Sequence, residues 1–293
     1  MNNNLDYFEA FVWPFCAKDC LFCNEWWKWK REFHSFDNFK EIIKNNNFQK
    51  VVLTGWEPMM NPRLDEYITH CTNKNILTWI VTAIDSKNYL EKIGKYLDSW
   101  LNELMISLEW PEKIHDHLVQ EDWAMKRILE VLQFVKKHKS DCKIIIHTNI
   151  NKLNYKYLPH FLDVILKNFP NIFTYHLQML EPFGSAVKHQ DILFEKYWIL
   201  LKPLFEKIEN ISHNDKIKFW RLPLCLADTK FHKYISQTPH IYESHQEKTI
   251  LAWYDEYQYQ SKKCDTCSKN INCDKFLDWY VQTFWESELQ PFD

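Results

Sequence analysis

Two kinds of hydrophobic pattern alternate along most of the chain. The first is a short run of consecutive apolar residues, as in 143–147 (Lys-Ile-Ile-Ile-His), which is typical of a parallel strand covered on both faces. The second repeats apolar residues at the spacing of an amphipathic helix, as in Ala124, Ile128, Leu132 and Val135. Strands that alternate with amphipathic helices predict a parallel sheet with right-handed crossovers.

The pattern also predicts where each element lies. Strands are expected at 7–13, 50–54, 76–84, 103–108, 143–149, 172–180 and 216–222. Helices are expected at 38–45, 63–73, 87–100, 124–137, 158–168 and 194–210, with Asp37 as the N-cap of the first. Six strand–helix units in this order predict an α/β fold.

The last part of the chain has a different character. A polar, aromatic stretch there carries four cysteines, Cys225, Cys264, Cys267 and Cys273. With 293 residues, of which 46% are hydrophobic, the chain can bury a full core, and one barrel would use most of it. We therefore expect a barrel at 1–210 and a small, loop-rich, cysteine-containing cap at 211–293 that needs a metal to order it.

Charge and the terminal sequence narrow the classes of partner. The 36 basic and 39 acidic residues are well mixed and give a net charge of −3, which favours neither a nucleic-acid backbone nor an acidic membrane as partner. The N-terminus lacks the basic and apolar regions of a signal peptide, and no run of 18 apolar residues occurs. We expect a cytoplasmic protein whose nine cysteines include metal ligands.

Three cysteines follow the first predicted strand in C-x3-C-x2-C spacing, at Cys16, Cys20 and Cys23. A closed zinc site needs a fourth ligand, whereas an iron–sulfur cubane held by three thiolates leaves one iron open for a substrate or cofactor. A partial zinc knuckle or free thiols remain the alternatives.

This spacing after a first strand resembles the signature of the radical S-adenosylmethionine (SAM) superfamily. The resemblance implies a partial (β/α)6 TIM-like barrel in which Cys16, Cys20 and Cys23 hold a [4Fe-4S] cluster. The open iron would bind SAM, whose one-electron cleavage gives a 5′-deoxyadenosyl radical that abstracts hydrogen from a substrate. It also implies that Phe22 neighbours the adenine and that a reductant such as flavodoxin or ferredoxin supplies the electron.

The resemblance extends to residues just past other predicted strands, where a barrel places its ligands. Gly55, Trp56, Glu57 and Pro58 resemble the family's Gly-Gly-Glu-Pro motif, whose backbone binds the SAM amino group, with Trp56 as the one departure.

The segment 107–116 resembles Ser-Leu-Asp-Gly-Pro-x-x-x-His-Asp. It implies that Ser107 binds the SAM ribose or carboxylate, although a serine that simply ends a strand is the alternative. Asn149 is expected at the ribose hydroxyls and Gln178 in the substrate cavity, whereas His147 is expected to be a core histidine.

The four C-terminal cysteines resemble the auxiliary-cluster region called SPASM. Cys264, Cys267 and Cys273 have its C-x2-C-x5-C core, but the further cysteine of the full pattern is missing. With Cys225 they are expected to hold one auxiliary [4Fe-4S] cluster, and structural zinc is the alternative. Cys71 and Cys142 are expected to be ordinary buried thiols.

The SPASM-like region and the 107–116 motif favour a peptide or protein side chain as substrate, as in a peptide maturase. The alternatives are a small-molecule cofactor precursor, RNA, or a non-catalytic zinc-binding protein on the same fold. Because no peptide-recognition domain precedes Cys16, a leader peptide is expected to bind elsewhere or to be presented by a separate protein.

Glycine and tryptophan usage is unusual. The chain has 3 glycines and 14 tryptophans, where average usage gives about 20 glycines. Trp56 and Trp110 fall on glycines of the two resembled motifs, and Trp123 and Trp285 also fall where relatives tend to have glycine. We predict that several tryptophans are UGA codons read as glycine in the organism; the alternative is a truly tryptophan-rich enzyme.

Overall fold

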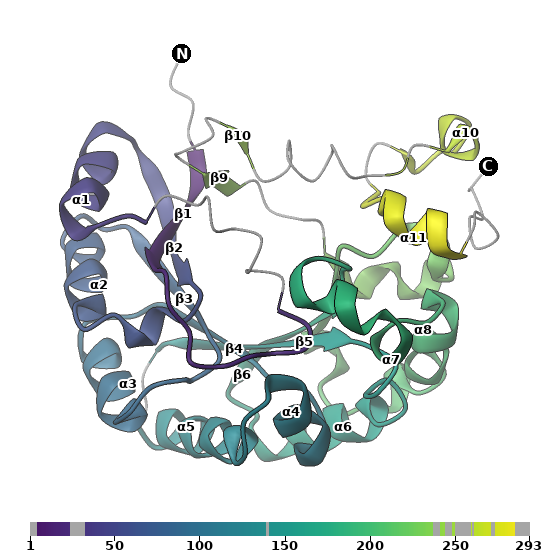
Figure 1. The fold of residues 1–293 in the computed structure, drawn as a ribbon, viewed down its shortest axis with the longest axis horizontal. Helices are drawn as coiled ribbons and strands as arrows, with labels where there is room; N and C mark the ends of the chain where they lie inside the picture. The colour runs from purple at the N-terminus through teal and green to yellow at the C-terminus, as the bar shows by residue number, and fades with distance from the viewer. Residues whose placement is uncertain are drawn as a thin grey trace.

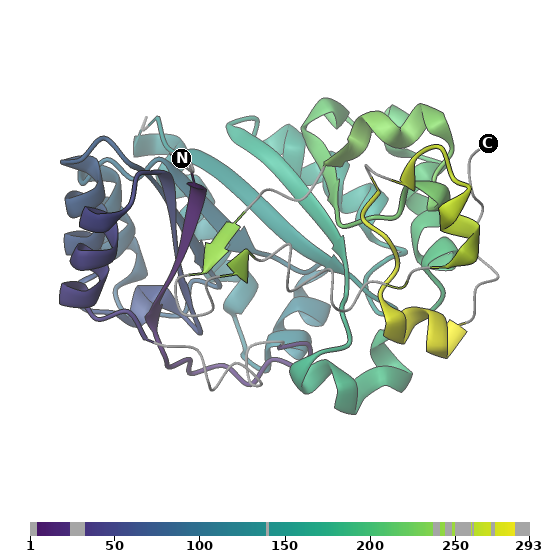
Figure 2. The same ribbon diagram turned by 90° about the horizontal axis from the view of Figure 1, so that it is seen from above.

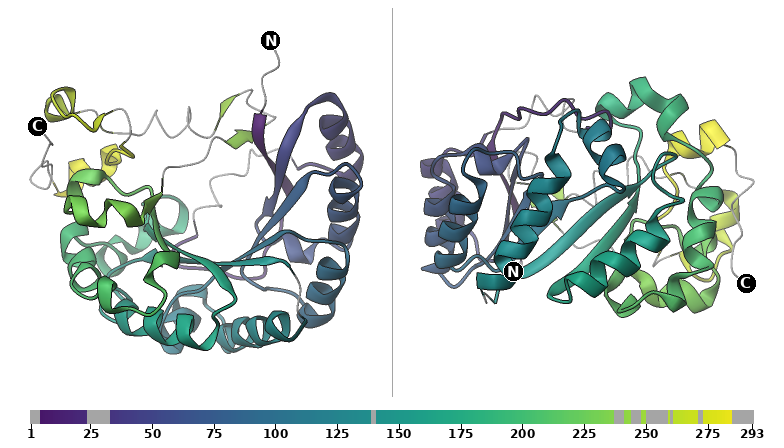
Figure 3. Two further views of the ribbon diagram at one scale, coloured as in Figure 1. Left: turned by 180° about the vertical axis from the view of Figure 1, so that it is seen from behind. Right: turned by 90° about the horizontal axis from the view of Figure 1, so that it is seen from below.

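The computed structural model describes residues 5–23, 33–138, 141–236, 241–243, 248–249, 259, 261–270 and 273–284. Its centre is an open sheet with the order β10-β9-β1-β2-β3-β4-β5-β6-β7-β8. Neighbouring strands from β9 to β8 pair in parallel, and β10 pairs with β9 in antiparallel orientation. The sheet curves into an arc whose outer side carries the helices (Figures 1 and 3). The expected α/β partial barrel is confirmed.

Most predicted elements lie within a few residues of their expected places. The strands are β1 (Leu5–Trp13), β2 (Phe48–Gly55), β3 (Leu77–Thr82), β4 (Glu103–Ser107), β5 (Lys143–Ile150), β6 (Ile172–Met179), β7 (Ile217–Trp220), β8 (Ile235–Ser236), β9 (Ile241–Glu243) and β10 (Lys248–Thr249). The helices are α1 (Phe36–Asn45), α2 (Leu64–Thr72), α3 (Tyr89–Asp98), α4 (Glu112–Val119), α5 (Ala124–His138), α6 (Leu158–Asn168), α7 (Gln190–Leu193), α8 (Tyr197–Phe205), α10 (Lys262–Asp265) and α11 (Asp278–Phe284).

Two expectations about helices were wrong, and one helix was missed. Ser35 rather than Asp37 caps α1, because the Ser35 hydroxyl accepts the Asn38 N–H at 3.3 Å while Asp37 pairs with Lys40 inside the first turn. The helix expected at 194–210 is α8 alone, followed by a separate 3-10 turn at Ile208–Asn210. Helix α4 was not predicted.

Alternation along the strands separates two hydrophobic layers. Val51 and Leu53 belong to the large core between the sheet and the outer helices. Val52, between them, faces the inner side and packs in a small cluster with Trp79, Met105 and Ile145. The inner side is the face that an open barrel leaves for ligands.

A buried ion pair fills the inner face at the N-terminal ends of its strands. Lys50 of β2 pairs with Glu103 of β4, and the two side chains are only 11% and 12% exposed. The Lys50 ammonium also lies over the rings of Trp79 and Tyr7, at 4.6 and 5.4 Å from their centroids. Reactants must therefore occupy the opposite end, where the strands finish.

The C-terminal part is joined to the barrel rather than separate from it. Strands β7 and β8 lie beyond residue 210 and extend the same sheet. Helix α11 packs beside α8 (Figures 1 and 2), where the Tyr280 hydroxyl accepts the Tyr197 N–H at 2.7 Å and the two rings stack at 3.8 Å. The boundary between 210 and 211 stays a prediction. Among the described helices, none has both the length and the apolar composition to cross a bilayer.

Candidate functional site

The three N-terminal cysteines lie on the loop that leaves the C-terminal end of β1. This loop, residues 14–23, crosses from β1 toward α4 and the 3-10 helix Gly184–His189 (Figure 1). Three hydrogen bonds fix its course: Ala17 N–H donates to Asp85 Oδ2 at 3.1 Å, Leu21 N–H to the Leu118 carbonyl at 2.8 Å, and Ser185 N–H to the Cys23 carbonyl at 2.7 Å. The loop is thus tied to three separate parts of the barrel.

The thiols of this loop are half-buried and close enough to interact. Burial raises the pKa of Cys16 to about 12. The pKa of Cys20 is raised even more, chiefly by burial and then by the neighbouring Cys23 and Cys16 thiols. The Cys16 sulfur accepts the Lys18 N–H at 3.4 Å. Binding of a metal group would therefore displace protons from these thiols.

Three thiols on one loop match the number of thiolates in an iron–sulfur cubane that leaves one iron open, whereas a closed zinc site needs a fourth ligand. Cys16, Cys20 and Cys23 would hold such a cluster.

The residues predicted to bind the SAM amino group are joined to the cysteine loop. Trp56 N–H donates to the Trp13 carbonyl at 3.0 Å, and Glu57 N–H donates to the Phe15 carbonyl at 3.1 Å. Gly55 has φ +151°, and a Cβ there would lie 2.3 Å from the Trp13 carbonyl oxygen, so the contact requires glycine.

The Glu57 side chain organises the turn after β3 instead of facing outward. Its buried carboxyl group accepts the Met59 N–H at 3.0 Å, the Thr82 hydroxyl at 2.6 Å and the Ala83 N–H at 2.9 Å. This turn holds Ile84 at φ 55°, an unusual conformation for a β-branched residue, and leads directly to Asp85. Glu57 therefore supports the carboxylate that binds the cysteine loop.

The other predicted SAM residues lie side by side on the inner face. Ser107 of β4 pairs in register with His147 of β5, and Asn149 of β5 pairs with Gln178 of β6. All are on the same face as Val52 by alternation, at the C-terminal ends of the strands. Phe22 packs nearby against a separate cluster that includes Leu118, Leu180, Ala186, Leu193 and Phe194.

Glu109 holds Asn149 in place, a role that the sequence did not predict. Its buried carboxyl accepts the Asn149 N–H at 3.1 Å and the Asn154 amide at 2.8 Å, while its own N–H donates to His115 Nδ1 at 3.0 Å. Burial raises the pKa of Glu109 to about 8. The signal in the sequence was the position of Glu109, which is a carboxylate just past β4 and close to the candidate ligand Ser107.

Two neutral histidines and an indole line the inner face below Asn149. The Trp220 ring lies 4.4 Å from the His176 ring and 6.1 Å from the His147 ring. Burial lowers the pKa of His147 to about 4 and that of His176 to about 3, so both are uncharged at neutral pH. This surface can accept an uncharged group with hydrogen-bonding capacity.

The comparison with known families decides the identity of this arrangement. Residues 11–165, more than half of the 293 residues, match the family model described as the Radical SAM superfamily. This chain belongs to the radical SAM superfamily. The family implies a [4Fe-4S] cluster and SAM as cofactors, and it supports an enzymatic activity.

Solved structures of radical SAM enzymes share the fold. Streptococcus suis SuiB bound to S-adenosylmethionine aligns with a TM-score of 0.64 at 15% identity, over 96% of this chain and 78% of that one. Tagged anSMEcpe with bound AdoMet aligns with a TM-score of 0.61 at 13% identity, over 97% and 96% of the two chains. At these identities the likeness shows the fold alone.

A second similarity covers a smaller region. Leucine–tRNA ligase of Rickettsia akari is 30% identical over 133 residues, which are 40% of this chain and 14% of the ligase. The chain thus spans about a seventh of the length of this curated relative. So short a match does not place this radical SAM protein among the ligases.

The cysteines expected to hold an auxiliary cluster are partly gathered. Cys273 accepts the Leu224 N–H at 3.3 Å, and its pKa is raised to about 12 by burial and then by nearby Cys225 and Cys264. Cys267 N–H donates to the Cys264 carbonyl at 3.1 Å. A second cluster stays a prediction. Cys71 and Cys142 are buried thiols, as expected.

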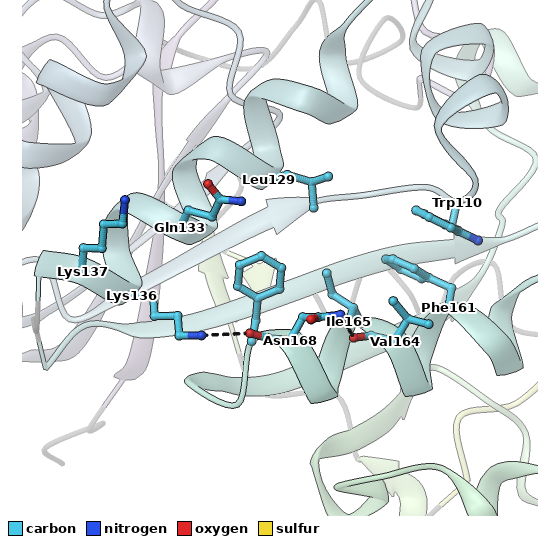
Figure 4. Close-up of a pocket in the computed structure, with 10 residues that line it drawn as sticks. Trp110, Leu129, Gln133, Lys136, Lys137, Phe161, Val164, Ile165 and Asn168 are labelled. Atoms are coloured by element: carbon cyan, nitrogen blue, oxygen red, sulfur yellow. Dashed lines mark hydrogen bonds between the residues drawn. The ribbon is translucent and has the colours of Figure 1, made fainter.

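A cavity of about 600 Å³ lies away from this site, between α5 and α6 of the outer helical layer (Figure 4). Trp110, which follows β4, lines it and stacks on Phe161 with the ring centroids 4.4 Å apart. The Trp110 indole therefore lies in the outer layer. Trp285, expected at a glycine position, lies outside the described residues.

Proposed function

We propose that this chain is a radical SAM enzyme that reductively cleaves SAM and abstracts hydrogen from a substrate. The observation that carries the proposal is the loop with Cys16, Cys20 and Cys23, tied by hydrogen bonds across the C-terminal ends of the strands. The cluster and SAM would supply the radical chemistry, while the protein binds, orients and excludes water. Flavodoxin or ferredoxin is the proposed source of the electron.

The neighbouring residues have separate roles in this proposal. The 55–58 backbone binds the SAM amino group, and Phe22 packs against the adenine. Ser107 binds the ribose or carboxylate and Asn149 binds the ribose hydroxyls, because both residues stand at strand ends on the inner face. Glu109 keeps Asn149 in position through the Asn149 N–H.

A peptide or protein side chain is the proposed substrate. Two structures of similar fold support it by their descriptions: SuiB bound to precursor peptide SuiA, with a TM-score of 0.63, and anSMEcpe with AdoMet and a Kp18Cys peptide, with a TM-score of 0.61. A small-molecule cofactor precursor or RNA is the second candidate. A gene for a short precursor peptide beside this one favours the first, and a cofactor biosynthesis cluster favours the second.

The experiment is anaerobic reconstitution with iron and sulfide, followed by dithionite and SAM. We expect 5′-deoxyadenosine from the wild type and none from Cys20→Ala, while Cys71→Ala, which removes a cysteine of the outer core, keeps the activity. A protein that binds zinc alone and forms no 5′-deoxyadenosine would contradict the proposal.

We further propose that Cys225, Cys264, Cys267 and Cys273 hold one auxiliary [4Fe-4S] cluster, with structural zinc as the alternative. Counting the irons bound per chain distinguishes an auxiliary cluster from structural zinc. Two cubanes give about eight irons per wild-type chain, and Cys267→Ala should keep about four. About four irons in both proteins would leave no iron for a second cluster.

A further inference from the structure

Lys18 lies inside the cysteine loop, yet its side chain is only 1% exposed. The ammonium group donates to the Ala83 carbonyl at 2.9 Å and lies 3.5 Å from Glu121 Oε2. Glu121 also binds the guanidinium of Arg127. Two cations thus share one carboxylate, and these three side chains together carry one net positive charge beside the cysteine loop.

This charge lies close to the first sulfur atom of the loop. The Lys18 main-chain N–H donates to the Cys16 sulfur at 3.4 Å. The ammonium binds the carbonyl of Ala83, two residues before Asp85, whose carboxylate lies 3.9 Å from the same sulfur. The charge of Lys18 also lowers the pKa of Glu57, which burial raises. Because the ammonium is shielded from solvent, salt screens its field less than that of a surface lysine.

Acidic groups of the turn that Lys18 binds make the cation more important. Asp85 Oδ2 lies 3.9 Å from the Cys16 sulfur, and the buried Glu57 carboxyl accepts the Ala83 N–H at 2.9 Å. A cluster held by three thiolates would add negative charge there, and its reduction adds one more. A buried cation beside the loop stabilises the reduced form selectively.

We propose that Lys18 is a positioning residue that raises the reduction potential of the cluster, and that Glu121 limits this effect. The inference rests on the proposed function, because it requires a cluster at Cys16, Cys20 and Cys23. Reduction potentials of iron–sulfur clusters depend on net charge and burial, which are the two quantities that Lys18 changes. The lysine thereby makes the electron transfer that starts the reaction easier.

The two variants Lys18→Met and Glu121→Gln test the sign of this effect. Methionine keeps the length of the buried stem, and Glu121 retains Arg127 as a partner. Glutamine can still accept from both cations. Each reconstituted protein is titrated with dithionite, without SAM, and the reduced cluster is measured by electron paramagnetic resonance beside the iron content.

At the potential where half of the wild-type cluster is reduced, Lys18→Met should have a ratio of reduced to oxidised cluster that is about tenfold lower. This corresponds to a midpoint potential lower by about 59 mV for a one-electron couple. Glu121→Gln should shift the ratio in the opposite direction, and Lys18→Arg should match the wild type. Should Lys18→Met bind no iron, Glu121→Gln carries the test by itself.

Shifts of equal sign in Lys18→Met and Glu121→Gln, or unchanged midpoints, would overturn the inference and leave the proposed function standing. A wild-type protein that takes up no iron at the loop would overturn both.

Discussion

At the scale of single residues, two tryptophans stand where the backbone favours glycine. Trp100 has φ 64° and Trp123 has φ 67°. Trp100 follows α3 in a Schellman motif, in which Leu101 N–H donates to the Tyr96 carbonyl at 3.0 Å and Trp100 N–H to the Leu97 carbonyl at 3.1 Å. Its side chain is 72% exposed, so packing does not compensate the backbone cost. This backbone supports the prediction that several tryptophans are recoded glycines.

We therefore expect Trp100→Gly to be more stable than Trp100→Ala by about 1 kcal/mol, because both remove the indole and only glycine removes the left-handed penalty. Urea denaturation of the two variants measures the difference. Equal stability would contradict the strain argument. UGG codons at 56 and 110 would end the recoding prediction in any case.

At the scale of elements, the sequence predicts the long strands well because each is a continuous buried run, as 143–147 shows. It misses α4, since Glu112–Val119 is rich in charged residues and histidine and overlaps the motif resembled at 107–116. Strands β8 to β10 have two or three residues each, too few for any period to be seen. Asp85 stands just past β3, where ligand-supporting residues are expected, but its contact with Ala17 depends on the folded loop.

That contact yields a prediction about metal loading. Asp85→Ala leaves the Ala17 N–H without its acceptor, so the cysteine loop should be less well held. Loss of such a supporting partner lowers metal affinity by about 10–100-fold, whereas Asp85→Asn keeps an oxygen at the same place. Iron retained after competition with a chelator gives the readout, and equal retention in the two variants would show that Asp85 does not support the loop.

At the scale of the whole molecule, buried histidines set the pH dependence of stability. Burial lowers the pKa of His115 to about 3, of His147 to about 4 and of His176 to about 3. The unfolded chain takes up protons at these residues below about pH 6.5, but the folded chain does so only nearer pH 3 to 4. Stability is therefore lost as the pH falls below about 6.5.

Glu109 and Glu57 act in the opposite direction but are fewer. Burial raises both carboxyl pKa values, so the folded form holds these protons to a higher pH and these groups favour folding as the pH falls. Below about pH 6.5 the three histidines have the larger effect on the unfolding free energy, because they outnumber the two carboxyl groups. His176→Phe should reduce the slope of unfolding free energy against pH by about 1.4 kcal/mol per unit between about pH 6 and pH 5. Denaturation curves across this range check it, and an unchanged slope would mean that His176 is protonated in the fold.

The buried Lys50–Glu103 pair has a consequence for the order of events in turnover. It fills the inner face at one end, so SAM and a larger substrate must approach from the other, past the cysteine loop. In the proposed function SAM binds against the cysteine loop, so a substrate seated first over that loop would block the entry of SAM. Turnover should then be ordered, with SAM the first to arrive and 5′-deoxyadenosine the last to leave. In steady-state kinetics 5′-deoxyadenosine should inhibit competitively against SAM and noncompetitively against the substrate, and competitive inhibition against both would mean that the two reactants arrive in random order.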